Sequence, residues 1–134
     1  MGSEETAGKL TWEDVLKRTD LIGGDIESVE DGVPYRGPLS KIEMDETMVH
    51  FFSPWCAYLD LQTGEWKKWN ITSCSVIKEI LPVDIGGGRV CFSLPLLGPC
   101  TLFPKGGSKL DPTKVKGLDL ADISSDELSA TPAD

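Results

Sequence analysis

A chain of 134 residues, 40% of them hydrophobic, has room for one domain with one hydrophobic core. Its formal net charge of −9 repels phosphate backbones, so a protein partner or self-association is favoured over nucleic acid. Pro, Gly or a charged residue interrupts every apolar run well before the ~18 residues that a membrane-spanning helix needs, which excludes a transmembrane segment and predicts no membrane partner.

The N-terminus and the cysteine count predict the compartment. Residues 1–9 are small and polar, lack the basic and apolar regions of a secretory signal, and are expected to be disordered. The even number of cysteines (Cys56, Cys74, Cys91 and Cys100) permits disulfides. Because a core of this size can fold without them, we expect reduced thiols and a cytoplasmic protein.

The clearest helix signal lies directly after this polar segment. Thr11 and Asp14 have the spacing of a capping box, in which each side chain bonds a free backbone N–H group of the first helical turn. Glu13 also suits the positive end of a helix dipole. The pattern predicts a short helix over about residues 12–19.

From residue 25 onward the sequence has the period of two that is typical of strands. Turn residues stand at 31–32 and 45–46, and the strand predicted over 35–44 should bend at Gly37-Pro38, because proline belongs at a bulge or an edge of a sheet. Further strands are predicted over residues 47–52, 75–83 and 89–94, with a glycine loop at 86–88 and an irregular extended segment over 96–103.

The most distinct hairpin spans residues 55–71, with Thr63-Gly64 at its turn. The string from Ala57 to Trp66 (A-Y-L-D-L-Q-T-G-E-W) resembles the hairpin of quinoprotein-type propeller blades. It occurs once and covers about a tenth of the chain, whereas a propeller needs several copies. The resemblance therefore implies a shared turn and no propeller.

These elements predict a mainly β (α+β) domain over residues 10–110, with a short N-terminal helix followed by five or more short, bent antiparallel strands. A small SH3-like or Sm-like barrel would suit such strands, because closure removes exposed strand edges. Residues 111–134 carry six acidic and two basic residues and few apolar ones. They are expected to form an acidic, mostly disordered tail.

The sequence shows no catalytic or metal-binding constellation. His50 is the single histidine, and we interpret it as a strand residue that faces solvent or bonds to a neighbour. The cysteines are 18, 17 and 9 positions apart, so no pair has the close spacing of a zinc knuckle. We therefore assign no catalytic residue, no metal and no cofactor.

The aromatic residues around positions 51–69 suggest a binding surface. Trp66 and Trp69 are three apart, so in a regular strand their rings point to opposite faces, and one of them should be exposed unless both faces are buried. Exposed aromatic rings beside lysines suit a protein interface or a stacked ligand. The candidate binding residues are Trp66, Trp69, Tyr58, Phe52, Lys67 and Lys68.

Two functional hypotheses follow from these patterns. The leading one is a non-catalytic binding or assembly module that uses the exposed aromatics on a β scaffold, and a small-molecule ligand stays open beside a protein partner. The alternative is a thiol-dependent enzyme or redox protein that uses Cys56 or Cys74. The absence of any catalytic pattern favours the first.

Overall fold

The computed structural model describes residues 9–95 and 97–118. Within these ranges the chain is mainly β, with eleven short strands in two sheets and one short α-helix, which confirms the predicted class. Neither sheet closes on itself, so the expected SH3-like or Sm-like barrel is not confirmed. Disorder is expected from the sequence for residues 1–9 and most of 111–134, and of these positions 1–8 and 119–134 lie outside the described residues. Lys9 forms an isolated antiparallel bridge with Val83.

Helix α2 (Trp12–Leu16) begins at the predicted capping box, with Asp14 N donating to Thr11 Oγ1 and Thr11 N donating to Asp14 Oδ2. It ends earlier than predicted. Arg18 takes an extended backbone and its guanidinium binds Asp20, after which the chain forms the 3-10 helix η1 (Thr19–Leu21). Trp12 and Val15 form the buried side of α2.

The larger sheet has the spatial order β11-β6-β5-β2-β1-β10-β9-β8. All its pairings are antiparallel except that of β11 with β6. Asp31 and Gly32, with φ of 55° and 80°, form the two-residue turn between its first two strands. Its strands are β1 (Asp25–Glu30), β2 (Val33–Pro38), β5 (Cys56–Asp60), β6 (Glu65–Trp69), β8 (Val83–Gly86), β9 (Arg89–Leu94), β10 (Gly98–Phe103) and β11 (Val115–Lys116).

The smaller sheet consists of β3 (Lys41–Met44), β4 (Met48–Phe52) and β7 (Ser73–Ile77), with β4 in the middle. The single bent strand predicted over 35–44 is two strands, because the chain leaves the larger sheet after Pro38 and enters the smaller one. The strand predicted over 75–83 is also divided. Ile80 N bonds Ile77 O in a turn after β7, and Val83 begins β8 in the other sheet.

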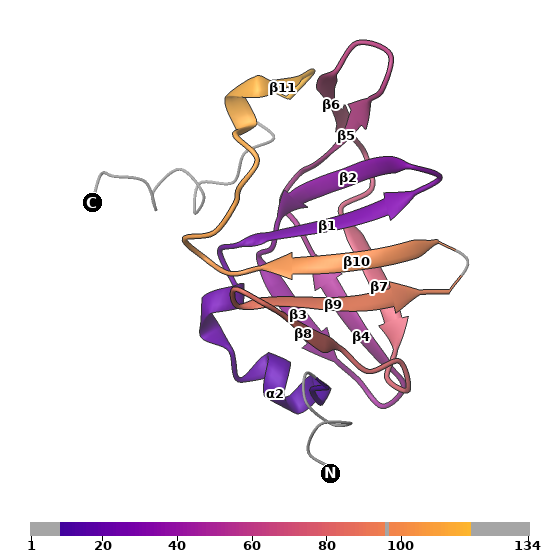
Figure 1. The fold of residues 1–134 in the computed structure, drawn as a ribbon, viewed down its shortest axis with the longest axis vertical. Coiled ribbons are helices and arrows are strands. Elements are labelled where there is room, and N and C mark those ends of the chain that lie inside the picture. The colour runs from indigo at the N-terminus through magenta and orange to yellow at the C-terminus, as the bar shows by residue number, and fades with distance from the viewer. Residues whose placement is uncertain (1–8, 96, 119–134) are drawn as a thin grey trace.

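The main core lies between the two sheets, which face each other in Figure 1. Helix α2 covers one end of it. The Trp12 ring centroid lies 5.8 Å from that of Phe51 in β4 and 5.2 Å from that of Phe92 in β9, so this ring joins the helix to both sheets. The other fully or nearly buried members are Val15, Leu21, Ile26, Leu39, Val49, Val76, Val90, Leu94, Cys100 and Leu102.

The segment after residue 110 is ordered over its first eight residues, although the sequence predicted little structure there. It forms the 3-10 helix η2 (Pro112–Lys114) and then β11 beside β6. Val115 is 4% exposed and packs with Trp55 and Ala57 in a second, smaller cluster. One buried valine on a polar segment gives no periodic pattern, which is why the sequence did not reveal this docking.

Replacing Val115 by alanine should lower the free energy of unfolding by about 2 kcal/mol, through the lost burial of two carbon groups and the space they leave. The neighbouring Lys116 side chain is 66% exposed, so Lys116→Ala should change the stability by less than about 0.5 kcal/mol. Urea unfolding of both variants measures the difference. Equal, small effects would show that the docked segment contributes nothing to folding.

Candidate binding site

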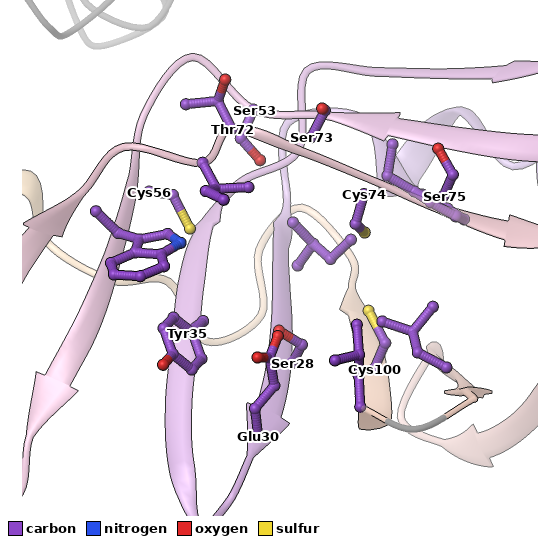
Figure 2. A pocket seen from close by; sticks show the side chains of 16 residues that line it. Ser28, Glu30, Tyr35, Ser53, Cys56, Thr72, Ser73, Cys74, Ser75 and Cys100 are labelled. Atoms are coloured by element: carbon purple, nitrogen blue, oxygen red, sulfur yellow. The ribbon is translucent and has the colours of Figure 1, made fainter.

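A pocket of about 370 Å³ opens between the two sheets, at the side where β7 is the edge strand. Both sheets contribute to its walls, as Figure 2 shows: Ser28, Glu30, Tyr35 and Cys100 come from the larger sheet, and Cys74 from β7. Apolar side chains line most of it, with hydroxyl, thiol and carboxylate groups among them. A concave, mainly apolar pocket with a few polar groups is the usual form of a binding site.

The different widths of the two sheets create this pocket. The larger sheet continues through β2, β5 and β6, while the smaller sheet stops at β7. Residues directly opposite each other in paired strands share a face, so the pairs Ser28–Tyr35 and Tyr35–Tyr58 continue the inner face beyond the core. A side chain at Gly37 in β2 would overlap the carbonyl oxygen of Trp55, the residue before β5. Only glycine therefore allows the two backbones to lie so close together.

Three aromatic rings form one wall beside the pocket. The Tyr35 centroid lies 5.2 Å from that of Trp69 and 6.3 Å from that of Tyr58, and Tyr58 and Trp69 are 5.7 Å apart. Each ring lies close to the other two, so no ligand-sized space remains between them. The three rings therefore form a continuous aromatic surface and not an aromatic cage around a ligand. Tyr35 and Trp69 line the pocket, and Tyr58 supports them from the side.

Trp66 and Trp69 lie on opposite faces of the larger sheet, as their spacing in the sequence predicted. Trp69 pairs with Cys56 and reaches the pocket, whereas Trp66 pairs with Leu59 and packs against the Val115 cluster on the other face. Both rings are half-buried. Of these two tryptophans, Trp69 is therefore the one that lines this pocket.

The other candidate residues do not gather at one place. Lys67 shares a face with Tyr58, and its ammonium is bound to Asp60 at 2.7 Å. Lys68 lies on the opposite face, next to Gly117. Phe52 belongs to the smaller sheet, where Lys41 Nζ stands 5.1 Å from its ring centroid. Of the six candidate residues, the structure brings together Trp69, Tyr58 and Lys67 on one face.

Three of the four cysteines line the pocket: Cys56, Cys74 and Cys100. Burial raises the pKa of Cys56 to about 11, so this thiol stays protonated at neutral pH. The interaction with Cys100 lowers the pKa of Cys74 and raises that of Cys100. Of the two thiols that the sequence singled out, Cys74 is thus the one whose environment favours the thiolate.

His50 takes no part in this thiol chemistry. Its Nδ1 lies 2.7 Å from Ser75 Oγ and its Nε2 lies 2.9 Å from Asp45 Oδ2, so both ring nitrogens have partners. The hydrogen bond with His50 lowers the pKa of the Asp45 carboxyl. This confirms the interpretation of His50 as a strand residue bonded to its neighbours.

Glu30 is the charged residue of the pocket lining, and sequence analysis did not find it. Over the described ranges no Lys, Arg or His side chain forms an ion pair with it. Glu30 follows Ile26 and Ser28 on the inner face of β1. This alternation in the sequence predicts that the three side chains share a face, but it does not predict that a pocket lies opposite them. Glu30 therefore gives the pocket a negative charge that an incoming cation could meet.

The edge of β7 offers free backbone groups beside the pocket. Ser53 N donates to Thr72 O at 2.8 Å and Lys78 N donates to Thr47 O at 3.0 Å, which places the even-numbered residues of β7 in the pairing with β4. Because alternate residues of a strand turn their N–H and C=O groups to opposite sides, Ser73 and Ser75 direct theirs to the open edge. No strand of the described residues pairs with that edge.

Within the described parts of the chain, no three His, Cys, Asp or Glu side chains converge as a metal ion would require. None of the helices in those parts has the length and apolar character needed to cross a membrane. Comparisons with protein-family models, with curated proteins and with solved structures found no match for this chain.

Proposed function

We propose that this chain is a non-catalytic binding module that takes up an extended segment of a partner protein along the edge of β7. The observation that carries the proposal is the coincidence of two features: the free edge of β7 and the inter-sheet pocket share Ser73, Cys74 and Ser75. Addition of a strand to an exposed sheet edge is a recurrent form of peptide recognition.

Alternate residues of β7 direct their backbone groups toward β4 and toward the open edge, and this alternation determines which groups a bound segment would meet. Its backbone would exchange hydrogen bonds with Ser73 and Ser75, whose N–H and C=O groups face outward. The residue between these two would lie opposite Cys74, on the inward face of the sheet, and would direct its side chain into the pocket. Main-chain bonds then supply affinity, and the pocket selects the side chain.

The walls of the pocket favour an apolar anchor with a basic neighbour. Tyr35, Phe51 and Leu94 supply apolar surface, and 370 Å³ is near the lower end of the about 300–1,000 Å³ usual for ligand pockets, which suits one large side chain. Glu30 at the same pocket and the net charge of −9 favour a Lys or Arg beside the anchor.

The test is selection of short peptides from a random displayed library, followed by binding measurements with two variants at one position. Ser75→Pro removes the outward N–H of β7 without touching its pairing with β4, whereas Ser75→Ala keeps that N–H. Both variants lose the contact of the hydroxyl with His50, so this loss cancels in the comparison.

Ser75→Pro should weaken binding of the selected peptides by about tenfold or more, since a backbone hydrogen bond is lost and the proline ring occupies the edge. Ser75→Ala should bind them as the unaltered protein does. Fluorescence anisotropy with labelled peptides measures both. Equal binding by the two variants would place the peptide elsewhere and remove the support for strand addition.

A further inference from the structure

Two cysteines face each other across the pocket from different sheets. Cys74 stands opposite Phe51 in the smaller sheet, and Cys100 stands opposite Ser28 and Phe92 in the larger one. Figure 2 shows their sulfur atoms turned toward one another. The two side chains interact, and both are free thiols.

The environments of the two sulfurs are unequal. Cys100 is completely buried, which opposes a negative charge on it and raises its pKa. Cys74 is half-buried at the wall of the open pocket, and the Cys100 side chain beside it lowers its pKa. Cys74 is thus the more readily ionised thiol of the two and the one that a reagent in the pocket would meet, with the second thiol directly behind it.

We propose that Cys74 and Cys100 form a reversible disulfide that joins the two sheets across the pocket, with a small disulfide such as glutathione disulfide as the oxidant. The pair would make the binding module sensitive to oxidation. This consequence rests on the function proposed above, whereas the formation of the bond does not.

The reaction proceeds by two exchange steps. The Cys74 thiolate attacks one sulfur of glutathione disulfide, forms a mixed disulfide and releases a glutathione thiolate. Cys100 then loses its proton to the released thiolate and attacks the Cys74 sulfur, which expels the second glutathione as a thiolate. This thiolate takes up, through solvent, the proton that Cys74 lost before its attack. The two protein thiols are oxidised by two electrons, and one glutathione disulfide is reduced to two glutathione thiols.

The other two cysteines have different surroundings. Cys91 lies on the opposite face of the larger sheet, where Thr101 Oγ1 donates to its sulfur at 3.9 Å. Cys56 also lines the pocket, but its sulfur lies 3.9 Å from Ala57 O in its own strand. In Figure 2 the Cys74 sulfur is turned toward that of Cys100, and this orientation singles out the Cys74–Cys100 pair.

The bond would occupy the position of the anchor side chain. A disulfide holds its two Cα atoms about 4.4–6.8 Å apart. The side chain of an added strand opposite Cys74 would enter the same space between β7 and β10. Oxidation should therefore close the pocket to the anchor and reduce peptide binding by about tenfold or more, as loss of a buried apolar side chain does.

The first experiment treats the reduced 134-residue chain with glutathione disulfide and maps the products by mass spectrometry. Two of the four thiols should disappear, in a peptide that links Cys74 to Cys100, and dithiothreitol should restore them. A link between Cys56 and Cys74, or no internal link, would overturn the proposal without any variant being needed.

Single substitutions test the order of the steps. Cys100→Ala should trap the mixed disulfide and carry one glutathione on Cys74, while Cys74→Ala should acquire no internal link. Cys91→Ala, on the other face, should react as the unaltered chain does. Glutathione found on Cys56 instead of Cys74 in Cys100→Ala, or first on Cys100 in the unaltered chain, would contradict the role given to Cys74.

Peptide binding separates this proposal from the proposed function. Reduced protein that binds the selected peptides and oxidised protein that does not would support both. A Cys74–Cys100 link with undiminished binding would overturn the closure of the pocket. If the reduced protein binds no peptide at all while the link forms, the proposed function fails and the disulfide stands by itself.

Discussion

Trp12→Ala should lower the free energy of unfolding by about 3–5 kcal/mol, because it removes a large buried ring and leaves a cavity. Trp12 is 2% exposed and packs edge-on against Phe51 and Phe92, one from each sheet. Its indole N–H also donates to Ile80 O at 2.9 Å. The substitution therefore removes the contact that holds α2 to both sheets.

Two further substitutions serve as controls for this result in urea or thermal unfolding. Trp12→Phe keeps an aromatic ring but leaves Ile80 O without its donor, and should cost about 1–2 kcal/mol. Leu16 lies in the same helix with 38% exposure, so Leu16→Ala should cost about 1 kcal/mol or less. A Trp12→Ala effect as small as that of Leu16→Ala would mean that the helix does not close the core.

Arg36→Met should destabilise the protein by about 3–5 kcal/mol at neutral pH, because it leaves a charged carboxylate buried without its partner. Arg36 Nε donates to Asp25 Oδ2 at 2.7 Å, and the Asp25 side chain is 1% exposed. Methionine preserves much of the aliphatic packing of the arginine. The loss should therefore be electrostatic and depend on pH.

Burial raises the pKa of Asp25, and this effect outweighs the lowering by Arg36 and by the N–H of Leu110. Between the ordinary carboxyl pKa of about 3.9 and the raised value, folded Asp25 keeps a proton that the unfolded chain has lost, so its contribution to stability falls as the pH rises. Removing Arg36 raises the folded pKa further. The deficit of Arg36→Met should thus be largest at neutral pH and smallest below the ordinary carboxyl value.

Arg18→Met is the matched control, since Arg18 binds Asp20 at 2.7 Å with side chains that are 31% and 48% exposed. An exposed pair of this kind contributes about 0–1 kcal/mol. Denaturant unfolding at several pH values compares the two variants. A deficit of Arg36→Met that is small, or the same at acidic and neutral pH, would show that the buried pair does not support the sheet.

The elements that sequence predicted well depend on neighbours in the chain. The capping box of Thr11 and Asp14 joins residues three apart, and both of its hydrogen bonds are present. The turn at Asp45 is equally local, with Thr47 N and Met48 N donating to its carboxylate. In such cases the residue types themselves determine the backbone.

The pocket depends on pairings that no local pattern contains. Tyr35 lies beside Tyr58 because β2 pairs with β5. The two strands between them in the sequence, β3 and β4, belong to the other sheet. The odd spacing of Trp66 and Trp69 predicted that their rings lie on opposite faces of the sheet. It could not show which of the two rings lines the pocket. The approach of Cys74 to Cys100 depends in turn on how two sheets pack, which the sequence of either strand does not specify.

The central position of β1 has a consequence for the protein during its synthesis. One neighbour of β1, the adjacent β2, leaves the ribosome soon after it, but the other is β10, from Gly98 to Phe103. The contacts that fix Trp12 and Asp25 also await distant residues, since Ile80 is 68 positions from Trp12 and Leu110 is 85 positions from Asp25. Native pairings between such distant residues form late. The nascent chain therefore has the β1 edge unpaired until β10 has been synthesised, and Trp12 lacks its partner Ile80 until that residue emerges. This is the interval in which we expect the chain to depend on chaperones.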